Sequence, residues 1–337
     1  MDSLTHIAVG ACMGEGFMGK TVGRKGMLWG ALAQSIPDID FVAALWMDTP
    51  SSLLAHRGFT HSILFALISA TFMGLVAERW HRPHNISLKR WLLFFSGAIL
   101  GHLLLDAFNN YGVAWFEPFS QYRVSFNAIY VADPFFSIWP GIACAALILL
   151  RKKHPKRRFW WQFGLLACSA YLLYCTFNKF QIDRQVRTSL NKQNIPHERY
   201  FTTPAPLQNW LWYVVSGNEK GFYVGYHSLF DRQDTIAFQY FPRQEKLLDP
   251  VEDHESIQRL KRFSQGYYTM EKWSDTLVFN DLRFGQIIGW QDPREKFAFH
   301  FFLEGTYDNR MVVQRGRFAK WDRDVARRFW KRIWGKE

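Results

Sequence analysis

Apolar residues dominate the first half of the chain and occur there in separate runs. Four of these runs contain no Asp, Glu, Lys or Arg, and they cover residues 62–77, 91–105, 134–150 and 159–177. Two further apolar runs precede them, at residues 4–19 and 26–36. A membrane-spanning helix needs about 20 mostly apolar residues, with a lower limit of roughly 17. The pattern therefore predicts a polytopic α-helical membrane bundle of about six helices.

The second half of the chain is polar, charged and rich in aromatic residues. Residues 181–195 continue the last apolar run and predict a stalk helix. Stretches of alternating aromatic residues predict strands at residues 221–230, 235–242, 275–290 and 296–305. A polar helix at 252–263 interrupts them, and a basic helix follows at 322–334. We therefore expect a membrane-embedded domain over residues 1–178 and an α+β domain with an antiparallel sheet over residues 179–337.

The charges of the loops predict how the bundle crosses the membrane. Counted in chain order, the loops after the first, third and fifth apolar runs are rich in Lys and Arg. The loops after the second and fourth runs contain only two basic residues, Arg57 and Arg123. Cytoplasmic loops carry an excess of basic residues. The basic loops are therefore expected in the cytoplasm and the 179–337 domain outside it. The formal net charge of +12 follows in large part from these loops and requires no nucleic-acid partner.

The four cysteines lie in the apolar runs, where they act as small hydrophobic residues. Because the polar second half contains none, an extracytoplasmic location would add no disulfide.

Ionisable residues gather at the predicted outer ends of these helices. They are His6, Asp38, Asp40, His56, His61, His102 and Asp106. The loop charges that predict the topology do not involve these residues, so their common position is an independent signal. The run at 91–105 is long enough to span a membrane only if its helix continues to Phe108, which places His102 and Asp106 within it.

The spacing of these residues favours a joint metal site. His102 and Asp106 are four residues apart, so they share one face of a helix. Asp38 and Asp40 point to the same side if the loop that holds them is extended.

His56 and His61 flank Arg57 and Gly58, and the glycine permits a turn that brings both imidazoles inward. Imidazole and carboxylate ligands without thiolates suit zinc, manganese or non-haem iron. Seven candidates exceed what one tetrahedral ion needs, so one or two divalent ions are expected, and two would suit a hydrolytic centre.

Separate structural roles are the alternative. Asp38 and Asp40 are also suited to capping a helix. His102 and Asp106 are equally compatible with a proton relay or a structural pair, although ionisable residues within a membrane span are costly and usually functional. The joint metal site accounts for more of these residues, and we favour it.

Four sequence blocks carry a resemblance to a known family. They are THIAVG (5–10), PDID (37–40), HRGFTHS (56–62) and GHLLLDAFNNYG (101–112). Over about residues 1–119, these blocks resemble a bacterial family of inner-membrane-bound metal-dependent hydrolases. The resemblance implies a divalent-metal hydrolase of the bacterial inner membrane, with the seven residues above as motif positions.

The pair His102 and Asp106 also resembles an element of the zinc-dependent phospholipase C enzymes, which favours a phosphoester substrate. The expected reaction is attack by metal-activated water on a phosphoester of a lipid or small molecule near the lipid headgroups. Asp40 is a candidate general base. Arg57 would stabilise the charge on the transferring group, or would instead extend to a lipid phosphate. Asn109 and the residues after it are candidate orienting groups or turn residues.

Two other functional classes compete with the hydrolase. A non-enzymatic scaffold or receptor would hold one structural ion in the same cluster and bind a partner with its outer domain. A transporter would need ionisable residues near the middle of the membrane, and only Glu15 and His102 approach that depth.

One motif carries no function in this context. Residues 14–21, GEGFMGKT, match the G-x-x-x-x-G-K-[ST] phosphate-binding pattern, but that pattern requires a strand before it and a helix after it. Here it ends an apolar run. Gly10, Gly14 and Gly19 instead predict a helix surface that packs closely against a neighbour.

Overall fold

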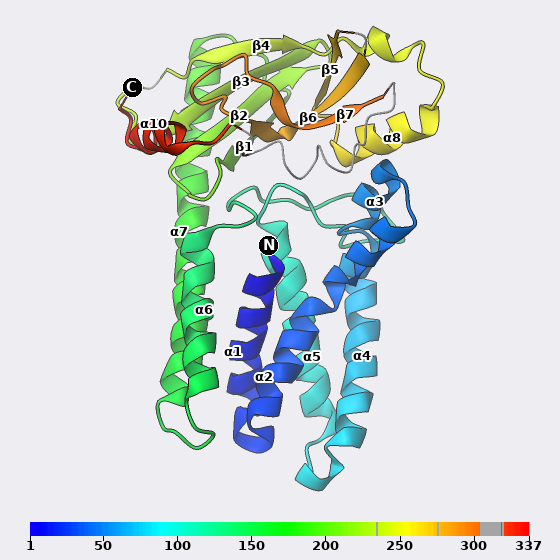
Figure 1. Ribbon diagram of the computed structural model, residues 1–337, viewed down its shortest axis with the longest axis vertical. Coiled ribbons are helices and arrows are strands. Elements are labelled where there is room, and N and C mark those ends of the chain that lie inside the picture. The colour runs from blue at the N-terminus through cyan, green and yellow to red at the C-terminus, as the bar shows by residue number, and fades with distance from the viewer. Residues whose placement is uncertain (234, 275, 304–317, 319, 337) are drawn as a thin grey trace. The chain divides into compact units, whose positions relative to one another are not determined.

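A computed structural model describes residues 1–233, 235–274, 276–303, 318 and 320–336 (Figure 1). The chain divides into two compact units. The first consists of Met1–Trp46 and Ala55–Cys175, and the second of Met47–Leu54 and Thr176–Glu337. The short segment Met47–Leu54, which the sequence assigns to a loop of the membrane region, thus clusters with the second unit.

The first unit is helical. Its α-helices are α1 (Ser3–Val22), α2 (Arg24–Ser35), α4 (Ile63–Trp80), α5 (Leu88–Ala107), α6 (Pro134–Leu149) and the first part of α7 (Arg157–Lys192). Short 3-10 helices join them, namely η1 (Pro37–Leu45), η2 (Phe59–His61) and η3 (Arg82–His84). The main helices α1, α2, α4, α5 and α6 run side by side (Figure 1).

Two helices in the described part of the chain, α4 and α5, are long and apolar enough to cross a membrane. The helix α6 is apolar but has only 16 residues. The six-span bundle therefore stays a prediction. The helix α7 runs without a break through the last apolar run and the predicted stalk, which confirms that the stalk continues this run.

Side-chain caps begin several of these helices. Asp2 caps α1, Ser62 caps α4, Ser87 caps α5 and Asp133 caps α6, each by accepting a hydrogen bond from a backbone N–H of the first turn. The cap at Ser62 ends the HRGFTHS block, so His61 lies immediately before the start of α4.

Glycines bring α1 and α2 into close contact. A Cβ atom added at Gly10 or Gly14 would overlap the backbone carbonyl of Gly30 or Gly26 on α2. The predicted close packing is confirmed at these two positions, whereas Gly19 lies beside the carboxylate of Glu15 on its own helix. The phosphate-loop letters are part of the continuous helix α1, as their apolar context indicates.

The second unit contains two antiparallel sheets. The first has the order β1 (Arg199–Pro204), β2 (Leu211–Asn218), β3 (Gly221–Ser228) and β4 (Phe238–Pro242), and the second has β5 (Tyr268–Trp273), β6 (Thr276–Gln286) and β7 (Phe297–Phe302). The predicted strands correspond to β3, β4, β6 and β7, although residues 275, 304 and 305 of the predicted stretches lie outside the described residues. The sequence analysis did not identify β1, β2 and β5.

Helices complete the core of this unit. Ile182, Val186 and Leu190 are four residues apart along α7 and pack against Trp212 and Val214 of β2. The remaining helices are α3 (Thr49–Ala55), η4 (Glu245–Leu248), α8 (His254–Phe263) and α10 (Arg323–Ile333). The two α-helices that the sequence predicts at 252–263 and 322–334 are thus confirmed as α8 and α10.

Candidate metal centre

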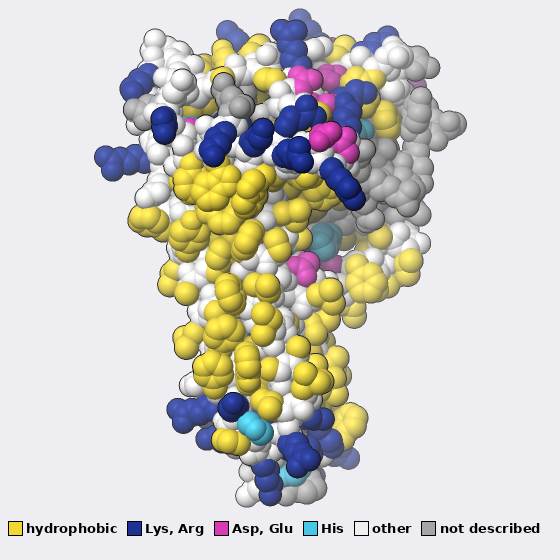
Figure 2. Space-filling model, turned by 60° about the vertical axis from the view of Figure 1, so that its left-hand side comes forward, with side chains coloured by type: hydrophobic (Ala, Val, Ile, Leu, Met, Phe, Trp, Pro, Cys, Tyr) yellow, Lys and Arg dark blue, Asp and Glu magenta, His cyan; other side chains and the backbone are white. Residues whose placement is uncertain are grey.

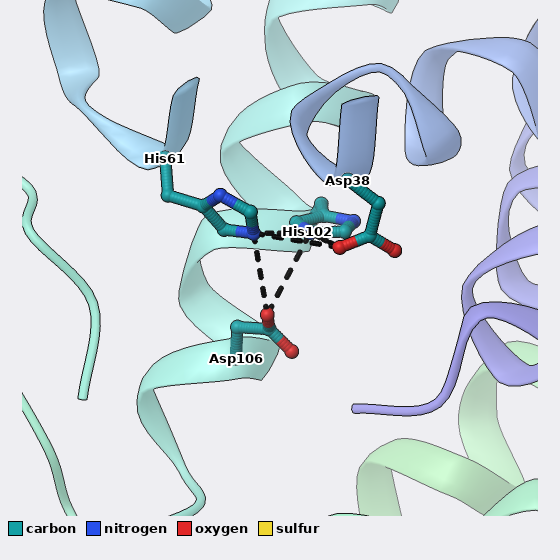
Figure 3. A group of neighbouring side chains, drawn as sticks. All are labelled: Asp38, His61, His102 and Asp106. Atoms are coloured by element: carbon teal, nitrogen blue, oxygen red, sulfur yellow. Dashed lines mark hydrogen bonds and ion pairs between the residues drawn. The ribbon is translucent and has the colours of Figure 1, made fainter. Parts of the chain in front are cut away.

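Four elements of the helical unit supply the predicted site residues. His6 lies on α1, Asp38 and Asp40 lie in η1, His61 ends η2, and His102 and Asp106 lie one turn apart on α5. His56 precedes η2. The side chains of Asp38, His61, His102 and Asp106 point toward one another (Figure 3).

Four ligand atoms of this group converge on one point. His61 Nε2 and His102 Nε2 are 3.2 Å apart. Asp38 Oδ1 is 3.6 Å from both of these nitrogens, and Asp106 Oδ2 is 3.5 Å from His61 Nε2 and 3.7 Å from His102 Nε2. All four atoms lie within 4.8 Å of one another.

These distances suit a tetrahedral ion. Zinc binds nitrogen and carboxylate oxygen at about 2.0–2.2 Å, so two ligand atoms of a tetrahedral site are roughly 3.3–3.5 Å apart. Five of the six separations, between 3.2 and 3.7 Å, lie close to that range, and the sixth, between the two carboxylate oxygens, is at most 4.8 Å. This buried group of histidines and aspartates could therefore bind a divalent metal ion.

Hydrogen bonds at the far side of each imidazole ring determine which nitrogen faces the centre. His102 Nδ1 lies 2.6 Å from the backbone carbonyl oxygen of Gln34, an acceptor only, so Nδ1 carries the hydrogen. His61 Nδ1 faces Asp40 Oδ2 at 3.2 Å and Thr60 Oγ1 at 3.1 Å. The hydroxyl of Thr60 donates to Asp40, so it accepts from His61.

The two Nε2 atoms lie 3.2 Å apart, so their lone pairs are kept from facing each other either by a proton on one of the rings or by a cation between them. Asp106 Oδ2 also accepts no hydrogen bond among the described residues, although it is buried. Both observations fit a cation at the point where the four atoms converge.

Both carboxylate oxygens of Asp40 interact with neighbouring residues. Its Oδ1 lies 3.0 Å from His56 Nδ1, and its Oδ2 accepts from the backbone N–H of Arg57 and the hydroxyl of Thr60. Burial raises the pKa of this carboxyl group, but the hydrogen bonds from His56 and His61 outweigh burial and hold the pKa well below its usual range. Asp40 is therefore a carboxylate that orients two histidines.

His6 contacts the group from α1. Its Nδ1 lies 3.0 Å from Gln34 Oε1, and its Nε2 lies 3.1 Å from Asp106 Oδ1, the oxygen opposite the one that faces the other ligands. The ring stacks on His102 with a centroid distance of 3.8 Å. The amino group of Met1 also contacts Asp106 Oδ1.

Arg57 has an unusual backbone conformation. Its φ is 59°, in the left-handed region, where a side chain other than glycine costs on the order of 1 kcal/mol or more. Gly58, with a φ of −84° and a ψ of −129°, follows it in the same turn, so Arg57 and not the glycine is the left-handed residue there. The turn directs the backbone N–H of Arg57 to Asp40, and the side chain is buried.

The guanidinium of Arg57 lies beside the candidate centre. Its Nε is 3.0 Å from Asp106 Oδ2, but it makes no hydrogen bond among the described residues. Its Nη1 donates to Asn109 Oδ1 at 2.6 Å, and its Cζ lies 4.9 Å from the centre of the Tyr111 ring. Asn109 thus acts as an orienting residue and also accepts from the backbone N–H of Tyr111.

The structure links all seven predicted residues by direct contacts, but only Asp38, His61, His102 and Asp106 converge on one point. Two supporting residues escaped the sequence analysis. Gln34 holds His6 and His102, and Thr60 lies between Asp40 and His61. A polar glutamine near the end of the apolar run at 26–36 was the one local signal for Gln34.

Comparison with known proteins agrees with a membrane location. A protein named inner membrane protein YbcI from Escherichia coli (strain K12) is 30% identical over 154 residues, which are 45% of this chain and 81% of that protein. The uncharacterized protein YfhP from Bacillus subtilis (strain 168) is 30% identical over 235 residues, which are 67% of this chain and 68% of that protein. No solved structure matches the chain significantly.

The name of the first relative gives a location and the name of the second gives neither a location nor a reaction, so the metal-dependent hydrolase named by the resemblance is not confirmed. The family match covers residues 1–182, which include the whole candidate centre and more than half of the chain. The chain therefore belongs to the YdjM inner membrane protein family.

Proposed function

We propose that the chain is a membrane-bound metal-dependent hydrolase whose ion is held by Asp38, His61, His102 and Asp106. The observation that supports it most is the convergence of one ligand atom from each of these four residues, all within 4.8 Å of one another. This ligand set suits zinc best, with manganese and iron as alternatives. When bound, such an ion supplies Lewis acidity and activates water.

His56 is suited to proton transfer beside this centre. Its Nδ1 lies 3.0 Å from Asp40, so Nδ1 carries the hydrogen and Nε2 is the basic atom. In the described part of the chain no group hydrogen-bonds to this Nε2, and the side chain is 38% exposed. We therefore assign the role of general base to His56. Asp40, which the sequence analysis named as the candidate general base, becomes a positioning residue.

Arg57 is suited to stabilising negative charge on the group that is attacked. The guanidinium is buried, and its Nε lies 3.0 Å from Asp106 Oδ2, one of the candidate ligand atoms. A phosphoester presents several oxygens that such a group binds well. The ester would lie near the lipid headgroups, with the α+β domain on the extracytoplasmic side.

A second ion would use His6. His6 Nε2 and Asp106 Oδ1 are 3.1 Å apart, so these two residues would help to hold that ion. The number of ions per chain tests this extension directly.

Metal content is the first measurement. Protein purified in detergent should contain one or two ions per chain, and His61→Ala and His102→Ala should each lose an ion. The control is His84→Ala, which removes an exposed histidine far from the site in sequence. If wild type binds no ion, or if all three variants keep it, the metal centre is wrong.

Hydrolysis is the second measurement. Wild type should cleave one member of a panel of phosphomonoesters and phosphodiesters, and His56→Gln should slow the reaction by about 10²–10⁴-fold without loss of the ion. Arg57→Gln should also slow it while metal content stays unchanged. A metal-loaded wild type that cleaves no ester in the panel would contradict the hydrolase.

One observation favours a non-enzymatic scaffold or receptor instead. Four protein ligands fill a tetrahedral ion, and structural zinc sites are closed in this way, whereas catalytic sites keep an open position. In that case, metal removal would lower the stability of the helical unit, and His56→Gln would leave the protein's role in the cell unchanged.

A further inference from the structure

The helical unit contains a basic cavity at the end that carries the Lys- and Arg-rich loops. Its volume is about 670 Å³, within the range of roughly 300–1,000 Å³ typical of ligand pockets. The basic side chains that line it are Lys20, Arg90, Lys152, Lys153, Arg157 and Arg158. They come from α1, α5, the loop between α6 and α7, and the start of α7.

The one carboxylate among the described lining residues is already paired. Glu15 accepts two hydrogen bonds from Arg157, from Nε at 2.7 Å and from Nη2 at 2.6 Å. Both side chains are largely buried. Glu15 therefore neutralises Arg157 and leaves the other lining cations without a compensating charge.

The remaining cations of the cavity are four basic residues and Arg90. Within the described residues, no carboxylate forms an ion pair with Lys20, Lys152, Lys153 or Arg158. Like charges around a concave surface repel one another, and an anion bound between them would relieve that repulsion. The cavity thus has the charge of an anion-binding site.

The surroundings of the cavity indicate the kind of anion. Phe17 on α1, Leu93 on α5 and Leu166 on α7 are more than half exposed, and they lie on the same three helices as the lining residues. Arg90 donates to the backbone carbonyl of Phe17 at 2.7 Å, which joins the basic lining to this apolar surface. Figure 2 shows Lys and Arg gathered at the end of the helical unit, next to a broad hydrophobic surface.

We propose that this cavity binds the headgroup of an anionic phospholipid, with the acyl chains against the adjacent apolar surface. Loop charge assigns this end to the cytoplasmic side, so the lipid would belong to the inner leaflet. Basic pockets between membrane helices on that side suit anionic headgroups. The inference is independent of the proposed hydrolase.

The test uses full-length protein in vesicles that contain phosphatidylglycerol and phosphatidylcholine, with bound lipid measured by native mass spectrometry. Wild type should retain phosphatidylglycerol in preference to phosphatidylcholine. Lys20→Gln with Lys152→Gln should weaken retention by about fivefold for each lysine removed, since one basic residue contributes about that factor at an anionic lipid surface.

The matched control is Lys25→Gln with Lys89→Gln. It removes two lysines from the same set of basic loops, but both side chains are exposed and lie outside the cavity. This control should retain the lipid like wild type. Equal loss in both double variants would mean general surface attraction, and loss in neither would mean no site, so either result overturns the proposal.

Two further experiments test the charge requirement of the cavity and the need for acyl chains. The charge-conserving double variant Lys20→Arg with Lys152→Arg should bind phosphatidylglycerol, and its failure to do so would overturn the proposal even if the glutamine variant folds poorly. Inorganic phosphate should not displace the lipid, because it lacks acyl chains. Displacement by phosphate at equal concentration would assign the cavity to a soluble anion and overturn the lipid.

Discussion

Asp40 orients more of the candidate site than any single ligand does. Its two oxygens face His56, the backbone of Arg57, Thr60 and His61. A carboxylate behind a metal-binding imidazole keeps the hydrogen on the far nitrogen and directs the other nitrogen to the ion. At the scale of single residues, the ligand geometry therefore depends on a residue that does not itself reach the point of convergence.

We expect Asp40→Asn to weaken metal binding by about 10–100-fold, because an amide can no longer accept at both oxygens and His61 loses its orientation. Competition with a chelator of known affinity measures the change. Glu78→Gln, which removes a carboxylate from the other end of α4, should bind metal like wild type. Unchanged affinity in Asp40→Asn would show that His61 is held by other contacts.

At the scale of elements, the contact between α1 and α2 links packing to the site. Gly10 and Gly30 leave no room for a side chain between the two helices. α1 carries His6, and α2 leads directly into η1 with Asp38 and Asp40. The separation of these helices thus influences the distance between His6 and the other site residues.

Gly30→Ala should destabilise the helical unit by about 1–3 kcal/mol, since the added methyl group forces the two helices apart. Thermal unfolding in detergent measures the loss. The matched control is Gly97→Ala on α5, where an added Cβ meets no atom within 4 Å. The control should leave stability unchanged or raise it, because alanine favours a helix over glycine. Equal effects of the two substitutions would contradict the close contact.

The helix α10 is attached to its own domain by packing and by charge. Phe329 and Ile333 pack against Ala205 and Leu211. Arg332 donates to both oxygens of Asp231, at 2.6 and 2.9 Å. Burial raises the pKa of Asp231, but hydrogen bonds from His227, Arg332 and the backbone of Ser228 lower it well below its usual range.

This depressed pKa gives α10 a pH-dependent attachment. The unfolded chain binds the proton first, near the usual aspartate pKa of about 3.9. The stabilisation is therefore complete above that pH and is lost as the pH falls below it. The protection of α10 amides against hydrogen exchange, corrected for the intrinsic rate at each pH, should fall on acidification of the full-length protein, and Asp231→Asn should abolish most of that change. The exposed Asp249→Asn is the control, and an unchanged pH profile in Asp231→Asn would contradict the assignment.

At the scale of the whole molecule, the charges of the loops predict which parts face the cytoplasm. We expect the loop that holds Lys153 to lie inside and the domain that holds Asp249 to lie outside. The four native cysteines lie in the apolar helices α1, α6 and α7, so they should react slowly with a membrane-impermeant maleimide.

Single cysteines introduced at these two positions test the orientation. In intact spheroplasts, Asp249→Cys should be labelled, and Lys153→Cys should be labelled only after the membrane is permeabilised. The reverse pattern would invert the topology. Labelling of both from outside would mean that fewer helices cross the membrane than the apolar runs predict.

The sequence by itself determined the features that depend on neighbouring residues. Apolar runs, polar helical stretches and aromatic alternation are local, so they predicted the main helices, α8, α10 and four of the strands. The strands β1, β2 and β5 were not identified, although β2 contains the aromatic and β-branched residues that favour a strand. The grouping of the site residues at one end of the helices was also predictable, because loop charge assigns every helix end to a side.

Only the tertiary structure decided how these residues divide their roles. His61 and His102 come from segments 41 residues apart, and the 3.2 Å between their Nε2 atoms depends on how the helices pack. Gln34 and Thr60 have no motif of their own, and they matter only because folding brings them to the far side of these rings. The separation of candidate ligands from orienting groups therefore follows from distances and hydrogen bonds between distant segments, which no local pattern contains.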